Sequence, residues 1–144
     1  MTQTLVTQSI IKQASLKTFA SLAFGLALIA APAAQAAPLK IGMTFQELNN
    51  PYFVTMQKAL NDAAASTGAT VVVTDAHHDV SKQVSDVEDM LQKKIDILLV
   101  NPTDSTGIQS AVTSAKKAGV VVVAVDANAN GPVDSFVGSK NFDA

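Results

Sequence analysis

Short runs of apolar, largely β-branched residues alternate with helical patterns along most of this chain, and this alternation restricts the possible fold more than any other feature. Four runs and a shorter fifth are typical of strands: 39–45, 70–74, 95–100, 120–125 and 135–139. The first four are apolar on nearly every residue, as expected for parallel strands covered on both faces. Helical segments of ordinary length lie between them, as in βαβ units with right-handed crossovers. The sequence therefore predicts a doubly wound parallel sheet, a three-layer αβα fold of the α/β class.

The helices between the strands are predicted from apolar residues at a spacing close to 3.6 and from their capping residues. Asn50 is a good N-cap for the first helix, and Pro51 suits its first helical position. Asp79 is the expected cap of the second helix, and Asp104 or Ser105 that of the third.

The N-terminal part of the chain has the features of a secretory signal peptide. Lys12 and Lys17 precede an apolar stretch at 18–31, and small residues follow at 34–36 (Ala-Gln-Ala). A positive region, an apolar region and a small-residue cleavage site are the three parts of such a peptide. A membrane anchor is the alternative, but the apolar stretch is shorter than the ~20 residues that a spanning helix needs. We therefore expect residues 1–36 to be removed on export.

The charge and the cysteine content exclude several classes of function. The chain has 10 Lys+Arg against 12 Asp+Glu, and none of the cations is arginine. Proteins that bind nucleic acid normally present a basic face with arginine, so this class is set aside. The absence of cysteine rules out disulfides, thiolate metal ligands and a cysteine nucleophile. An exported protein without disulfides fits a bacterial periplasm as well as the extracellular medium.

The segment Leu-Asn-Asn-Pro-Tyr-Phe at 48–53 follows the first predicted strand and opens the first predicted helix. Tyr52 and Phe53 should therefore stand at a helix N-terminus beside the carboxyl end of a strand, where open α/β sheets bind ligands. Aromatic faces next to amide groups suit a polyol, because rings cover the C–H face of a sugar and amides bond its hydroxyls. The alternative is a capped helix whose aromatic residues belong only to the core.

Polar residues follow the other strands as well. Asn101 comes after the third strand, Asp126 ends the fourth, and Gln46 follows the first. Because the carboxyl ends of parallel strands share one edge, Asn101 and Asp126 should converge there with Asn50, Tyr52 and Phe53. Carboxylates and amides can each bond two neighbouring hydroxyl groups. Turn and cap residues are the alternative, and for Asp104 we prefer that interpretation.

An enzymatic function is not supported by the residues present. Ser105 and Ser139 have no evident general base, and the two adjacent histidines, His77 and His78, lack the spacing of a metal site. No glycine-rich phosphate loop follows the first strand. We therefore expect no catalytic residues, no metal and no cofactor, and we assign the histidines to a surface loop.

Three motifs give the chain a family resemblance. The segment LNNPYF, the segment ILLVNPTD at 97–104 and the segment VVVVAVDANA at 120–129 resemble the periplasmic sugar-binding proteins of ABC importers, in particular the ribose-binding type. The similarity covers 39–144, with the motifs in the right order. It implies a two-lobed receptor that closes on a monosaccharide and delivers it to a membrane permease, and that is a monomer when complete.

The resemblance also implies which side chains contact the sugar. The matching positions are Asn50, Tyr52, Phe53, Asn101 and Asp126, with Gln46 and Ser139 matching less closely. The ribose type follows its aspartate with an arginine that binds the sugar, and here that position is Ala127. The ligand is therefore expected among pentoses, hexoses and polyols rather than assigned to ribose.

Members of this family are roughly twice as long as this chain. The resemblance therefore implies that residues 37–144 form the N-terminal sugar-binding lobe, incomplete and without its second lobe, as in a fragment.

Three other functions remain open. The same fold serves as a periplasmic sensing module for chemoreceptors and sensor kinases, and it occurs in LacI-type repressors, although no helix-turn-helix is present. An exported hydrolase is the third.

Overall fold

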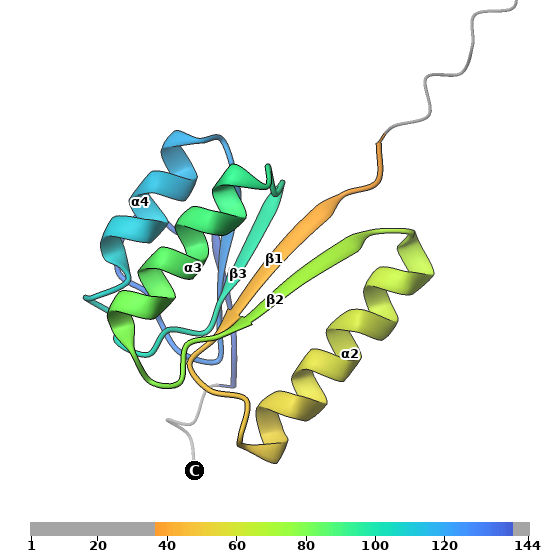
Figure 1. Ribbon diagram of the computed structural model, residues 1–144, viewed down its shortest axis with the longest axis horizontal. Helices are drawn as coiled ribbons and strands as arrows, with labels where there is room; N and C mark the ends of the chain where they lie inside the picture. The colour runs from red at the N-terminus through yellow and green to blue at the C-terminus, as the bar shows by residue number, and fades with distance from the viewer. Residues whose placement is uncertain (1–36, 140–144) are drawn as a thin grey trace, which may run out of the picture. The chain divides into compact units, whose positions relative to one another are not determined.

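The computed structural model of the chain describes residues 37–139, in which strands and helices alternate. The strands are β1 (Lys40–Phe45), β2 (Thr70–Asp75), β3 (Ile97–Val100), β4 (Val121–Val125) and β5 (Ser135–Val137). The helices are α2 (Pro51–Thr67), α3 (Val80–Gln92) and α4 (Gln109–Lys117). All strand pairs are parallel, in the order β2-β1-β3-β4-β5. Helices α3 and α4 lie on one face and α2 on the other (Figure 1), which confirms the predicted doubly wound α/β fold.

The start of α4 differs from the prediction. Asp104 was expected to cap this helix, but its Oδ1 accepts the N–H groups of Thr106 and Gly107 in a turn that precedes it. Ser105 donates to the backbone of the β4–β5 connection and caps nothing. The N-cap position is Ile108, which makes no side-chain hydrogen bond. The expected cap was therefore wrong, because an aspartate can satisfy local N–H groups in a turn without starting a helix.

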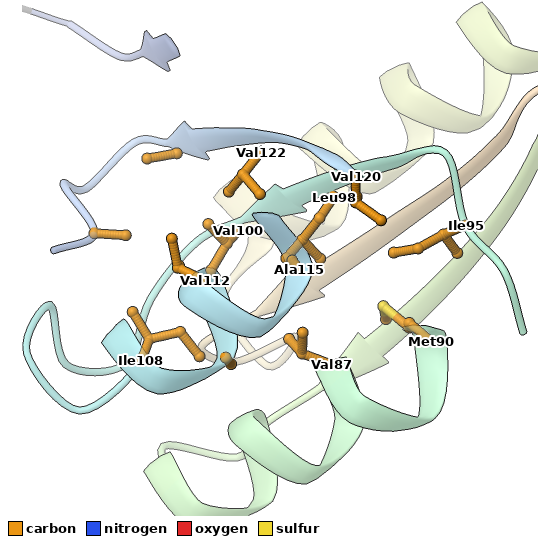
Figure 2. Close-up of a cluster of buried hydrophobic side chains, with 13 residues drawn as sticks. Val87, Met90, Ile95, Leu98, Val100, Ile108, Val112, Ala115, Val120 and Val122 are labelled. Carbon is orange, nitrogen blue, oxygen red and sulfur yellow. The ribbon is translucent and has the colours of Figure 1, made fainter. Parts of the chain in front are cut away.

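The larger core lies between the sheet and the pair α3 and α4 (Figure 2). Its largest fully buried side chains are Met90, Leu98, Ile108, Val87, Val100, Val112 and Val122. β1 contributes a glycine to this face. A Cβ atom at Gly42 would lie 2.7 Å from Met90 Sδ and 2.8 Å from Ile95 Cδ1, so glycine permits the close approach of these side chains.

The smaller core lies under α2. Met43 and Phe45 of β1 point to this face and pack with Phe53 of α2. By the register of the strands, the same face continues over β4 and β5. There Val121 is 45% exposed and Val137 is 60% exposed, so α2 leaves this part of the sheet uncovered by any helix of residues 37–139.

The ends of the chain need separate mention. The predicted signal peptide, residues 1–36, lies outside the described residues. None of the helices within the described part is long and apolar enough to cross a membrane. The fifth strand is shorter than predicted and ends at Val137.

Candidate functional site

The carboxyl ends of the strands bring four of the predicted site residues together. The Tyr52 hydroxyl donates to Asp126 Oδ1 over 3.2 Å, and Asn101 Nδ2 lies 3.5 Å from Asp126 Oδ2. The backbone N–H of Gln46 donates to Asn101 Oδ1 over 3.2 Å. These residues follow β1, β3 and β4, so only the parallel pairing of the strands joins them. They meet at one edge of the sheet, while their roles toward a ligand stay predictions.

The turn from β1 into α2 has the predicted caps. Asn50 Oδ1 accepts the Tyr52 N–H over 3.0 Å, and Pro51 occupies the first turn. The two aromatic residues differ in burial. Phe53 is 4% exposed and packs against Phe45 at a centroid distance of 6.0 Å, whereas Tyr52 is 55% exposed and lies edge-on to Phe53 at 5.3 Å. Tyr52 therefore offers a ring surface at the strand ends, and Phe53 supports it from the core.

Asp126 has an unusual backbone. Its φ is 67°, in the left-handed region that few residues other than glycine adopt, although aspartate is among the more tolerant. Its N–H donates to Val137 O over 2.8 Å, so the pairing with β5 holds this conformation. The Asp126 carboxylate raises the pKa of Tyr52, first through its charge and then through the hydrogen bond. Left-handed conformations of this kind are concentrated at functional sites.

Two buried polar side chains lie directly beneath this edge. Asn101 is 0% exposed, and its Nδ2 also donates to Val125 O over 3.2 Å, so both ends of its amide are engaged within the protein. Gln83 of α3 is likewise 0% exposed and was not predicted. It shares the apolar face of its helix with Val80, Val84 and Val87, and a polar residue on such a face is the signal that could have identified it.

The remaining candidates lie at the periphery. Ser139 is exposed and follows the end of β5, and among residues 37–139 no hydrogen bond joins it to the other predicted site residues. His77 and His78 form an exposed turn and pair with Asp75 and Glu47 at 3.2 and 3.1 Å. In the part of the chain that the structure describes, no group of three or more His, Asp or Glu side chains is placed to hold a metal ion.

Comparison with known proteins places the chain in a family. Residues 41–144 match the model of the periplasmic binding protein domain. The ribose import binding protein of Bacillus subtilis is 47% identical over 102 residues, which cover 70% of this chain and 33% of that protein. The ribose import binding protein of Escherichia coli is 34% identical over 129 residues, 88% of this chain and 44% of that protein.

A solved structure shows the same relationship. The myo-inositol binding protein of Caulobacter, with myo-inositol bound, superposes with a TM-score of 0.68 at 33% identity and covers 74% of this chain and 37% of its own. The chain thus spans less than half the length of the relatives that it matches. All three relatives are named as binding proteins. The chain belongs to the periplasmic binding protein family, and it is similar to ribose import binding proteins of that family.

Proposed function

We propose that residues 37–139 supply one wall of a monosaccharide site in the substrate-binding protein of an ABC importer. The observation that carries this proposal is the pairing of an exposed aromatic ring, Tyr52, with the carboxylate of Asp126 at the carboxyl edge of the sheet. A sugar presents both apolar C–H surface and vicinal hydroxyl groups, and this pair offers a partner for each.

The proposed roles follow from the geometry of each side chain. The Tyr52 ring covers a C–H face of the sugar, while the two oxygens of Asp126 accept hydrogen bonds from neighbouring hydroxyls. Asn50 uses its Oδ1 for the helix cap, so its Nδ2 is the group that it presents to the sugar. The Asn101 amide is bonded to Gln46 and Asp126, so it contacts the sugar only through the hydrogen-bonding capacity that these two bonds do not use.

Phe53 and Ser139 have smaller parts. Phe53 is nearly buried, so it acts mainly by holding the Tyr52 ring in place. Only an edge of the Phe53 ring faces the sugar. Ser139 is the outermost candidate and contributes a hydroxyl at the rim of the site.

The ligand is proposed as a pentose, a hexose or a polyol. Two of the relatives are named for ribose and one for myo-inositol, which supports a small polyhydroxylated ligand. Ala127 follows Asp126 in this chain and offers the ligand no side-chain donor at that position. The two oxygens of Asp126 suit a ligand with vicinal hydroxyl donors.

Export and delivery complete the proposal. Residues 1–36 direct the protein to the periplasm, and a membrane permease receives the sugar from the closed protein. The function as a sensing module of a chemoreceptor or sensor kinase remains the alternative, because it would use the same wall.

The proposal can be tested in a chimaera, because the chain spans a third of the Bacillus subtilis protein. Residues 39–139 replace the matching segment of that protein, and calorimetric titration follows binding of ribose, xylose, glucose and myo-inositol. We expect at least one of them to bind with a dissociation constant in the micromolar range or below.

The same chimaera with Asp126→Ala serves as the control for the site, and circular dichroism confirms that both proteins fold. A folded chimaera that binds none of these compounds, while the unmodified Bacillus subtilis protein binds ribose in parallel, would refute the proposed function.

A further inference from the structure

Gln83 is a fully buried polar side chain on the apolar face of α3. It is 0% exposed, like Val87 four residues later on the same face. An amide transferred from water to an apolar interior costs free energy unless it finds hydrogen-bond partners. A leucine or methionine would fill this space without that cost, so the presence of an amide here calls for a specific role.

The Gln83 amide is bonded on both sides. Its Nε2 donates to Asn101 O over 2.9 Å and to Thr44 Oγ1 over 3.3 Å, and its Oε1 accepts the Thr103 N–H over 2.8 Å. The side chain therefore ties α3 to β1 and to the backbone on both sides of Pro102. That backbone belongs to the segment after β3, which carries the Asn101 side chain into the candidate site.

The bonds continue from Asn101 to the strand ends on either side. Asn101 Oδ1 accepts from the Gln46 N–H after β1, and its Nδ2 donates to Val125 O and approaches Asp126 Oδ2. Hydrogen bonds to the backbone and the side chain of Asn101 thus connect the buried face of α3 with the carboxylate at the edge of the sheet. Its inner members, Gln83 and Asn101, are both closed to solvent.

We propose that Gln83 is a positioning residue, which fixes the backbone of residues 101–103 so that Asn101 holds Gln46 and Asp126 in place. Its importance for sugar binding rests on the function proposed above, whereas its effect on Asn101 does not.

The test compares two variants of the full chain by NMR. Gln83→Met keeps a similar shape but removes the amide, and Val87→Ala opens a cavity four residues away on the same helix face without touching a hydrogen bond. The first readout is the exchange rate of the Gln46 backbone amide divided by that of Leu98 in the same sample, a ratio that compares opening at Gln46 with opening of a buried strand. The second is the resonance of the Asn101 side-chain amide.

We expect Gln83→Met to raise the exchange ratio about tenfold, the effect of losing roughly one hydrogen bond, and to shift the Asn101 side-chain resonance. Val87→Ala should lower the melting temperature without raising the exchange ratio or shifting the Asn101 resonance. If Gln83→Met does not fold, Gln83→Glu takes its place, because it keeps the acceptor for Thr103 and loses the donor to Asn101; the same changes are expected.

Equal exchange ratios and an unshifted Asn101 resonance in the folded Gln83 variant and in Val87→Ala would overturn the proposal and leave Gln83 as an ordinary core residue. Neither readout requires a sugar, so this result is independent of whether the chimaera binds one.

Discussion

At the scale of single residues, the candidate site depends on Asp126 and its partner Tyr52. Asp126 occupies a left-handed backbone position that β5 holds in place, and it engages a tyrosine 74 positions earlier in the chain. Asp104 lies after the neighbouring strand, but its carboxylate is used by the backbone of its own turn. Two aspartates near the same sheet edge therefore have different roles, which can be separated by substitution.

We predict that Asp126→Ala weakens sugar binding more than Asp104→Ala does. Removing a charged hydrogen-bond acceptor costs about 1.5–3 kcal/mol, or roughly tenfold or more in affinity. Asp104→Ala should instead reduce stability by about 1 kcal/mol, because the N–H groups of Thr106 and Gly107 lose their hydrogen-bond acceptor. Calorimetric titration of the two chimaera variants measures the affinities, and urea unfolding measures the stabilities. Equal losses of affinity would contradict the assignment.

The ionisation of Tyr52 provides a measurement that needs no ligand. The Asp126 carboxylate opposes formation of the phenolate, so the pKa of Tyr52 lies above its ordinary value. The chain has 1 tyrosine, so the ultraviolet absorbance of phenolate reports this residue alone. We expect an alkaline titration midpoint above about 10, and a lower midpoint in Asp126→Asn, which removes the charge. Asp104→Asn is the control, and it should leave the midpoint unchanged.

At the scale of the elements, the connection between β4 and β5 is fastened to α4 by one aspartate. Lys116 Nζ lies 2.7 Å from both carboxylate oxygens of Asp134, and the Val122 N–H donates to Asp134 Oδ2 over 2.8 Å. These bonds lower the pKa of Asp134, the one to Lys116 most. Because the same connection leads to the strand that holds Asp126, the pair supports the site through β5.

The lowered pKa of Asp134 predicts how stability depends on pH. The Asp134 carboxyl group is ionised more readily in the folded state. Its contribution to the free energy of unfolding is therefore complete above the unfolded pKa of about 3.9, and it is lost as the pH falls through the lower pKa of the folded state. Unfolding free energies of the natural chain and Asp134→Asn should therefore differ by a constant amount above pH ~5 and converge in acid. Asp62→Asn, in the exposed pair with Lys58, should change stability little at any pH. A constant difference down to pH ~2 would contradict this role for Asp134.

At the scale of the whole described region, the sheet is covered unequally. Helices α3 and α4 bury one face, whereas on the other face α2 leaves Val121 and Val137 exposed. Strand β5 lies at one edge of the sheet, where it pairs with β4 and has no other partner among the described strands. Exposed apolar surface next to an open strand edge favours association between molecules.

We predict that Val137→Lys and Val121→Lys reduce self-association of the chain, because each places a charge on the uncovered face. The free energy of unfolding should change by no more than about 0.5 kcal/mol, as for surface substitutions. Sedimentation velocity at several concentrations measures the association. Ser110→Lys adds the same charge on the exposed side of α4 and should have no such effect. Unchanged association in both valine variants would show that this face is not responsible.

Much of the fold was predictable because its signals are local. Apolar runs on both faces of the strands require a sheet buried between helices, and Asn50 with Pro51 specifies where α2 begins. The convergence of Tyr52, Asn101 and Asp126 also followed from the sequence, since parallel strands present their carboxyl ends at one edge. These inferences need only the order of the residues and the geometry of a parallel sheet.

The tertiary structure decided what depends on neighbours distant in the chain. Gln83 was not predicted as a site residue, because its amide gains three partners only when α3 packs against β1 and the segment after β3. Phe53 is 4% exposed and packs against Phe45, a burial that its place beside Tyr52 in the sequence does not specify. The left-handed backbone of Asp126 depends on β5 pairing with β4. Each outcome is set by burial and by long-range hydrogen bonds, whose free energies exist only once the sheet has assembled, so the local patterns did not specify them.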